Sequence, residues 1–296
     1  MSLSSKAGYS IRRSPRSAHR VKARPDGFSL VEVAIALVIF ALLVGGLLVP
    51  LSAQVEQRRI LTTQQQLEEI KAALMGYAAA NGRLPCPSSG LNNGLESFAV
   101  GGNATNGNCS NFFNGFLPAA ALGLTPIDGQ GYAPDAWGLP QSRVRYAVSS
   151  RPLPLAANPV VGTDCALTPL LCQANPFTAG GGMKNVGIGN VASIEANATL
   201  ILVCSSSAGI GANCGTAAGP PPTLTLSSKA VFVVFSEAGN PGLGGAGADE
   251  QANLNNDPVF VSHPRTATAG NPFDDLVTWI GPGLLLNRMI EAGQLP

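Results

Sequence analysis

The 24-residue stretch FSLVEVAIALVIFALLVGGLLVPL, residues 28–51, decides how this chain folds. It carries a single charge, Glu32, and as an α-helix it spans roughly 36 Å, enough to cross a hydrocarbon core of about 30 Å. The sequence therefore predicts a membrane-spanning helix at residues 28–51. A cleaved secretory signal is the alternative, but its apolar region would be only about 7 to 15 residues long and would end in a small-x-small cleavage site.

Charge is divided unevenly on the two sides of this stretch. Residues 1–27 hold seven Lys or Arg and one Asp, a net charge of +6, whereas residues 28–296 hold 11 basic and 16 acidic residues, a net charge of −5. The positive-inside rule places the basic N-terminus in the cytoplasm and the remainder across the membrane. An acidic remainder also disfavours nucleic acid as a partner.

Glu32 is the one ionisable group inside the predicted span. A carboxylate at membrane depth costs several kcal/mol unless it has a partner, so it marks a functional site by default. The alternative is that Glu32 lies at the depth of the membrane interface and reaches water by snorkelling.

The string GFSLVE, residues 27–32, lies between a basic leader and an apolar helix. In this context it resembles the processing signature of type IV pilins and of type II secretion pseudopilins. The resemblance implies that a prepilin peptidase cuts after Gly27 and methylates the new N-terminal residue, Phe28. It also implies that Glu32 neutralises the α-amine of a neighbouring subunit, since two isolated charges in lipid are each costly and pairing offsets both costs.

The helical pattern continues beyond the span. Apolar residues recur with helical spacing at Ile60, Leu67, Ile70, Leu74 and Tyr77. Asn81-Gly82 is a helix stop signal, and Pro85 follows it. The sequence predicts an amphipathic continuation at 52–82, so that one helix runs from about residue 28 to residue 80, roughly 80 Å.

Residues 83–296 form a Gly-, Pro- and Asn-rich domain with short β signals. Apolar runs bounded by turn residues predict strands at 143–149, 199–205, 230–236 and 274–280, and a short helix follows at 284–291. An antiparallel sheet of about four strands covering the apolar stripe of the helix is the economical arrangement. The stretches 86–131, 150–192 and 205–228 have no clear period and are expected to be loops.

The resemblance extends into this domain. LEEIKAALMGYAAANGRLPCP (67–87) is similar to the junction between helix and globular domain in pseudopilins, and DAWGLP (135–140) is similar to their D-x-W-G-x-P turn. Two segments near the C-terminus, FDDLVTWI (273–280) and AGQLP (292–296), resemble the corresponding segments of large minor pilins. The resemblance implies an α+β fold: a pilin-like lollipop in which a long N-terminal helix packs on a small antiparallel sheet with disulfide-tied loops and a short C-terminal helix.

Six cysteines lie after the predicted span: Cys86, Cys109, Cys165, Cys172, Cys204 and Cys214. Fifteen pairings are possible. We expect the nearest-neighbour set, 86–109, 165–172 and 204–214, because each bond staples one of the predicted loops, and such bonds contribute on the order of 2–4 kcal/mol each. A metal site is the alternative, but no C-x-x-C motif occurs.

Catalysis finds little support in the sequence. His263 is the only histidine after the predicted span, its HPR context predicts an exposed loop, and no nucleophile motif accompanies it. A metal site has a weaker signal in the oxygen-rich residues Asp249, Glu250, Asn255 and Asp257, which are calcium candidates although their spacing matches no EF-hand. We expect no other cofactor and no enzymatic activity.

Two classes of function remain. The first is a structural minor subunit of a type IV pilus or of a type II secretion pseudopilus, and the second is a binding or adhesion module carried by the pilus. The partners implied are prepilin peptidase, other pilins in a helical filament, the inner membrane and its assembly platform. The expected location is a single pass through the inner membrane and then the filament, on the periplasmic or extracellular side. A membrane-anchored enzyme is a third, disfavoured class.

Overall fold

The computed structural model describes residues 27, 29–139, 141–156, 165–190, 199–208, 214, 224–241 and 247–295, and of residues 44–51 the helical backbone alone. The chain forms two compact units, Met1–Ala53 and Gln54–Pro296. One helix, α1 (Leu30–Asn81), contributes residues to both. The predicted long N-terminal helix is present, and the lollipop arrangement of the two units stays a prediction.

α1 ends where the sequence places its stop. Gly82 has a φ of +67°, a left-handed conformation that glycine adopts without strain, and its N–H donates to the carbonyl of Ala78 at 2.8 Å. The Asn81 side chain donates to the carbonyl of Tyr77 at 2.9 Å, so a second late carbonyl of the helix is satisfied.

The second half of α1 buries one stripe in the larger unit. The buried residues of this stripe recur every three or four positions: Thr63, Leu67, Ile70, Leu74 and Ala78. Tyr77, expected in the same stripe, lies at its edge, where its hydroxyl contacts Glu96 at 3.3 Å. Leu67, Ile70 and Leu74 of the predicted stripe are buried, whereas Ile60 and Tyr77 are only half-buried.

The main sheet is antiparallel and has the order β1-β2-β7-β9. Its strands are β1 (Gly115–Phe116), β2 (Arg145–Val148), β7 (Phe232–Ser236) and β9 (Leu276–Ile280). Along β7, Phe232 and Val234 join the core that contains the buried stripe of α1, whereas Val233 and Phe235 join a second core on the opposite face. Both faces of β7 are thus covered, which explains why its sequence is continuously apolar rather than alternating.

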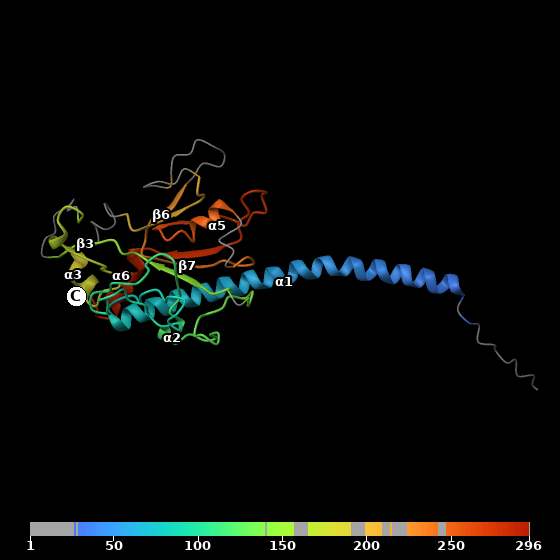
Figure 1. Ribbon diagram of the computed structural model, residues 1–296, viewed down its shortest axis with the longest axis horizontal. Coiled ribbons are helices and arrows are strands. Elements are labelled where there is room, and N and C mark those ends of the chain that lie inside the picture. The colour runs from blue at the N-terminus through green and yellow to red at the C-terminus, as the bar shows by residue number, and fades with distance from the viewer. Residues whose placement is uncertain are drawn as a thin grey trace, which may run out of the picture. The chain divides into compact units, whose positions relative to one another are not determined.

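A second sheet covers that opposite face, and here the expected single sheet is wrong. It comprises β6 (Thr225–Ala230), β5 (Ile201–Cys204) and β8 (Val259–Val261), in the order β6-β5-β8. β5 was expected in the main sheet, but it pairs antiparallel with β6 and parallel with β8. β6 lies in a predicted loop because its residues, TLSSKA, are mostly polar and partly exposed. The larger unit therefore has three layers: α1, the main sheet and the second sheet (Figure 1).

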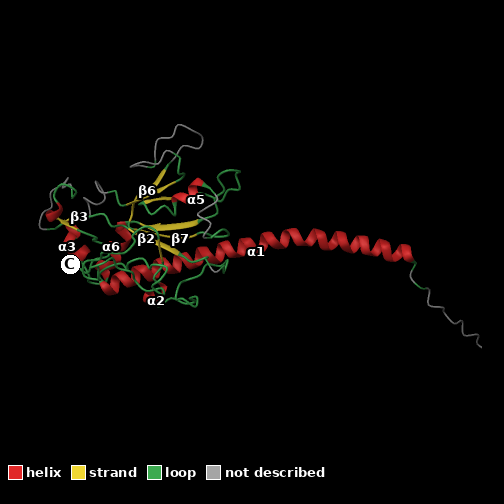
Figure 2. Cartoon of the chain, in the orientation of Figure 1, coloured by secondary structure: helices red, strands yellow, loops and turns green. Residues whose placement is uncertain are grey.

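The remaining elements are short and separated by the loops that dominate Figure 2. They are α2 (Ala119–Leu122), β3 (Leu153–Pro154), η1 (Pro169–Leu171), β4 (Cys172–Gln173), α3 (Gly182–Val186), η2 (Ile188–Asn190), α5 (Ala248–Ala252) and α6 (Pro282–Glu291). α6 starts two residues before its predicted start, with Pro282 in its first turn, and it buries Leu285, Leu286 and Met289.

Three disulfides tie these loops. The structure joins Cys86 to Cys109, Cys165 to Cys172 and Cys204 to Cys214, and none of the six cysteines is free. The predicted disulfides are present, and the pairing is the nearest-neighbour set. A cysteine metal site is thereby excluded, because a cysteine in a disulfide has no thiolate to offer.

Gly76 is a helix residue that the fold itself does not require. It is exposed on α1, and a Cβ built on it meets nothing within 4 Å. We expect Gly76→Ala to raise the free energy of unfolding by about 0.5–1 kcal/mol, because alanine loses less backbone entropy in a helix. Thermal denaturation of the detergent-solubilised chain measures this change. Gly82→Ala is the opposite control, since its φ of +67° disfavours a side chain, and equal effects of the two substitutions would contradict the prediction.

Candidate functional site

The first turn of α1 holds a reciprocal cap built from Ser29 and Glu32. The Ser29 N–H donates to Glu32 Oε2 at 3.0 Å, and the Glu32 N–H donates to Ser29 Oγ at 3.2 Å. This is a capping box, which satisfies two backbone donors at the helix start. The pattern Ser-x-x-Glu at 29–32 is the sequence signal of this box, a signal not used in the prediction for Glu32. Glu32 thus has a local structural role besides the assembly role that the resemblance implies.

Gly27 precedes this cap in open space. It is exposed, it belongs to no helix or strand, and a Cβ placed on it meets nothing within 4 Å. Phe28, the predicted new N-terminal residue, lies outside the described residues. Nothing described near Gly27 hinders a peptidase from holding an extended chain there.

The described first part of α1 is apolar and uncovered. Its exposed large side chains are Leu30, Val31, Val33, Ile35, Leu37, Val38, Ile39, Phe40, Leu42 and Leu43. An apolar surface this continuous marks contact with a membrane or another protein. A search of the described residues finds no helix that is both long enough and apolar enough to span a membrane. The predicted span is therefore not confirmed, and the side chains of its residues 44–51 lie outside the described part of the chain.

In the larger unit, the loop at the D-x-W-G-x-P turn contacts the second half of α1. Asp135 accepts hydrogen bonds from Ser236 Oγ at 2.5 Å and from the Trp137 N–H at 2.9 Å, and burial raises the pKa of its carboxyl group. The loop is fixed to the helix by the Gln66 side chain, which donates to the carbonyl of Pro134 at 2.7 Å.

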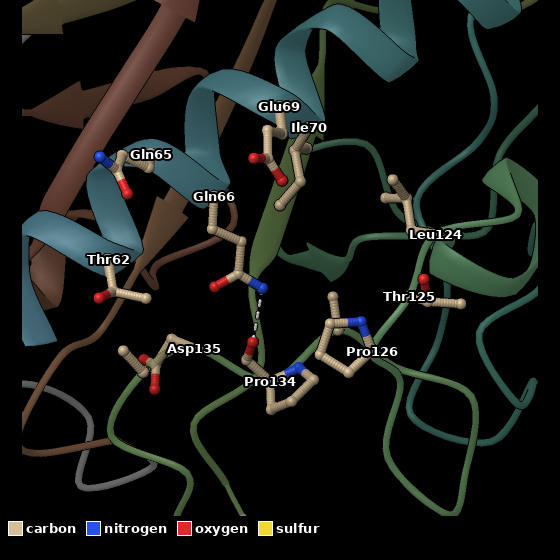
Figure 3. Close-up of a pocket in the computed structure, with 12 residues that line it drawn as sticks. Thr62, Gln65, Gln66, Glu69, Ile70, Leu124, Thr125, Pro126, Pro134 and Asp135 are labelled. Atoms are coloured by element: carbon tan, nitrogen blue, oxygen red, sulfur yellow. Dashed lines mark hydrogen bonds between the residues drawn. The ribbon is translucent and has the colours of Figure 1, made fainter.

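Between this loop and α1 lies a pocket of about 310 Å³. Figure 3 shows the side chains of Glu69 and Ile70 pointing from α1 into it, toward the loop with Pro126 and Pro134. Ile70, Leu124 and Pro126 form an apolar part of its wall, and the other lining residues from α1 are polar: Thr62, Gln65, Gln66 and Glu69. No local sequence pattern indicates this pocket, because the helix and the loop that line it are more than 50 residues apart in the chain.

The four calcium candidates do not converge. Asp249 is buried and accepts hydrogen bonds from the Ser207 N–H and from Asn271, and these bonds lower the pKa of its carboxyl group despite its burial. Asn255 donates to Asp257 at 2.8 Å within an exposed turn. Glu250 is buried elsewhere, where it accepts from Asn240 at 3.0 Å.

Glu250 instead meets two other carboxyl groups. Glu250, Asp274 and Asp275 each place an oxygen within 4.8 Å of the others, which is close enough to share a cation. The Asp274 N–H donates to Glu250 Oε1 at 2.9 Å, and Asp274 Oδ1 is buried without a hydrogen-bond partner. The pair Asp274-Asp275 was read only as the start of a strand, so sequence reasoning missed this carboxyl cluster.

The ionisation of Asp274 is expected to make the stability of the folded chain depend on pH. Burial and the adjacent Glu250 raise its pKa to about 6, whereas an unfolded chain has an aspartate pKa of about 3.9. The folded state therefore binds the proton more tightly, and its stability falls as the pH rises from about 4 through 6. We expect Asp274→Asn to match the parent at pH 4 and to exceed its stability at pH 7 by on the order of 1 kcal/mol, allowing for solvent screening. Melting curves over this pH range measure the difference, with Asp257→Asn, a half-buried aspartate outside the carboxyl cluster, as the control.

His263 is not the exposed loop residue that its sequence context predicts. Its ring stacks on Phe273 with centroids 4.0 Å apart, and its side chain is 16% exposed. Nε2 lies 3.2 Å from Asp249 Oδ2, and Nδ1 lies 2.8 Å from the carbonyl oxygen of Pro264. Phe273 and Asp249 lie ten and 14 residues from His263, outside the HPR triplet on which the prediction of an exposed loop rests. Both ring nitrogens have a protein partner, an arrangement that holds the ring in place and leaves neither nitrogen for a nucleophile.

Comparison with known proteins gives one match. A family model described as the prokaryotic N-terminal methylation motif matches residues 23–48, a range that contains Gly27, Phe28 and the capping box. No curated protein and no solved structure matches the chain.

Proposed function

The methylation motif at residues 23–48 is the signature of type IV pilins and pseudopilins, and we propose that this chain is a non-enzymatic, minor pilin-like subunit of a type IV pilus. Prepilin peptidase removes residues 1–27 and methylates Phe28. The mature subunit then assembles with other pilins through its N-terminal helix, and it needs no cofactor.

The observation that carries this proposal is the exposed segment at the start of α1. No described residue covers its large apolar side chains from Leu30 to Leu43, and Glu32 is the one charged residue in that range. A single carboxylate in an apolar surface needs a positive partner once water is excluded. The α-amine that cleavage creates on a neighbouring subunit supplies this charge in the proposed assembly.

The minor role is supported by the loops of the larger unit. Three disulfides and long irregular segments make Gln54–Pro296 bulky, and we infer that such bulk suits a subunit near the end of a filament, where lateral packing is less restrictive. The proposed location is the inner membrane, with the N-terminus in the cytoplasm beside the assembly platform, and afterwards the filament on the periplasmic or extracellular side.

A pilus-carried binding module is the second candidate, and one observation favours it. The loop closed by Cys165–Cys172 presents Leu167 and Leu170 to solvent, 80% and 92% exposed. Apolar side chains held outward on a cross-linked loop lose little conformational entropy when they bind a surface.

A deletion strain tests the proposed system. We expect loss of surface pili and of twitching motility with protein secretion intact, and restoration of both by the wild-type gene. Loss of exoprotein secretion with normal pili would instead assign the subunit to a type II secretion pseudopilus. Normal pili, motility and secretion would contradict both assignments and leave the binding module, scored by surface adhesion.

A further inference from the structure

We propose that successive copies of this chain contact each other through α1, with Arg58 of one copy entering the pocket beside Glu69 of the next. This rests on the proposed function, because insertion into one membrane makes the α1 helices of neighbouring subunits parallel. The contact adds three features to that function: the pocket that receives the neighbour, the side chain that fills it, and the axial displacement between the two α1 helices.

The receiving surface is the pocket between α1 and the loop, and four of its lining residues carry the argument: Glu69, Ile70, Leu124 and Pro126. Ile70, Leu124 and Pro126 give the roughly 310 Å³ pocket an apolar wall, and the Glu69 side chain points into the same pocket (Figure 3). The Glu69 side chain is exposed, and no hydrogen bond or ion pair joins its carboxylate to another described residue. An apolar wall with an unpaired carboxylate fits an arginine, whose stem packs on apolar surface while its guanidinium pairs with the carboxylate.

The inserting side chain lies on the same face of the same helix. The Arg58 side chain is exposed, and its guanidinium makes no hydrogen bond or ion pair with any other described residue. Eleven residues separate Arg58 from Glu69, and at about 100° per residue this is three turns plus roughly 20°. The Arg58 guanidinium and the Glu69 carboxylate, neither of which has a partner among the described residues, therefore lie on one face of α1, three turns apart.

This spacing defines one contact between parallel copies. Shifting a second copy by three turns, roughly 16 Å along the helix, brings its Arg58 level with Glu69 of the first. Arg58 and Glu69 lie on one face of α1, so the contact sets this face of one copy against the same face of the next and joins the two copies as a pair. A minor subunit built this way occurs in adjacent copies rather than singly.

Gly76 supports a close neighbour on this face. It lies seven residues beyond Glu69, two turns along the helix and about 20° around it. A Cβ at Gly76 would meet no described atom within 4 Å, so packing of the described residues does not require this helix-weakening glycine. Glycine at such a position lets a second helix approach closely.

Cysteine cross-linking in the full-length protein tests the contact. Two tagged copies, Arg58→Cys and Glu69→Cys, are expressed together, and the filament and membrane fractions are oxidised. We expect a disulfide-linked heterodimer. All six native cysteines are already paired, so none competes. Within one chain the two positions are roughly 16 Å apart, beyond the reach of a disulfide, so a bond reports contact between copies.

Arg59→Cys paired with Glu69→Cys is the matched control, since residue 59 lies about 100° around the helix from residue 58. At least fivefold less cross-linking is expected for the control. Equal yields for both pairs, or no 58–69 bond in chains that are recovered in filaments, would overturn the contact and leave the proposed function standing. Absence of the wild-type chain from filaments would overturn both.

Charge exchange gives an independent readout. Glu69→Arg places two like charges at the contact and is expected to lower recovery in sheared filaments about fivefold, with an unchanged melting temperature because the residue is exposed. The double variant Arg58→Glu/Glu69→Arg restores the pair with reversed sign and should regain most of the recovery. A double variant no better than Glu69→Arg would refute the pairing.

Discussion

Glu32→Val is expected to be cleaved normally and to be absent from sheared filaments. The substitution leaves the apolar segment of α1 intact but removes its one carboxylate. The α-amine of the neighbouring subunit would then enter an apolar contact unpaired, and leaving one member of a buried ion pair alone costs roughly 3–5 kcal/mol. Recovery in filaments should therefore fall at least about a hundredfold. Immunoblots of sheared filaments and of whole cells measure recovery and cleavage in the same culture.

The capping box at Ser29 and Glu32 requires a control that separates charge from helix capping. Glutamine also serves at the third position of a capping box, so Glu32→Gln keeps the cap and removes the charge. If the charge drives assembly, the Gln variant should fail like the Val variant. Full recovery of Glu32→Gln alone would assign Glu32 to capping, and full recovery of both variants would refute a role in assembly.

Gly27→Val should leave the whole chain as an unprocessed, slower-migrating form that still carries its 27-residue basic leader. Gly27 lies in open, irregular chain, and a β-branched side chain beside the scissile bond obstructs the extended backbone that a peptidase must hold. Without cleavage no α-amine forms at Phe28, so the uncleaved chain should also be missing from filaments. Mass spectrometry of the purified chain gives both its mass and the methylation state of its N-terminus.

Ser29→Ala is the matched control for processing, because it changes a residue two positions away and leaves the glycine in place. It should be cleaved at the normal site even though the capping box is lost. Normal processing of Gly27→Val would eliminate the prepilin peptidase assignment, whatever the outcome of the Glu32 variants.

Local patterns predicted the elements that depend on neighbouring residues. The end of α1 at Asn81 followed from Asn81-Gly82, since a left-handed glycine acts within one turn. The β7 run followed from its apolar, β-branched residues, because a strand that is buried on both faces has no polar side. The exposed polar strand β6 was missed for the opposite reason: its partner β5, not its own sequence, makes it a strand.

In the candidate site, too, some residues could be predicted from their neighbours in the sequence, and others depend on contacts between distant segments. Gly27, Phe28 and Glu32 could be named from six consecutive residues, because a peptidase and a helix cap each read a short segment. The pocket at Glu69 combines α1 with a loop near residue 126, and the carboxyl cluster combines α5 with the start of β9. No local period connects segments so far apart, so folding alone brings them together.

By itself, the sequence determined the processing motif, the long helix and its end, and the apolar segment with its single carboxylate, since each is set by contacts within a few residues along the chain. The tertiary structure decided that the β signals form two sheets, that Glu250 lies with Asp274 and Asp275, and that one face of α1 stays open between Arg58 and Gly76. These features depend on which surfaces cover one another, and burial is a property of the whole packed unit rather than of any segment.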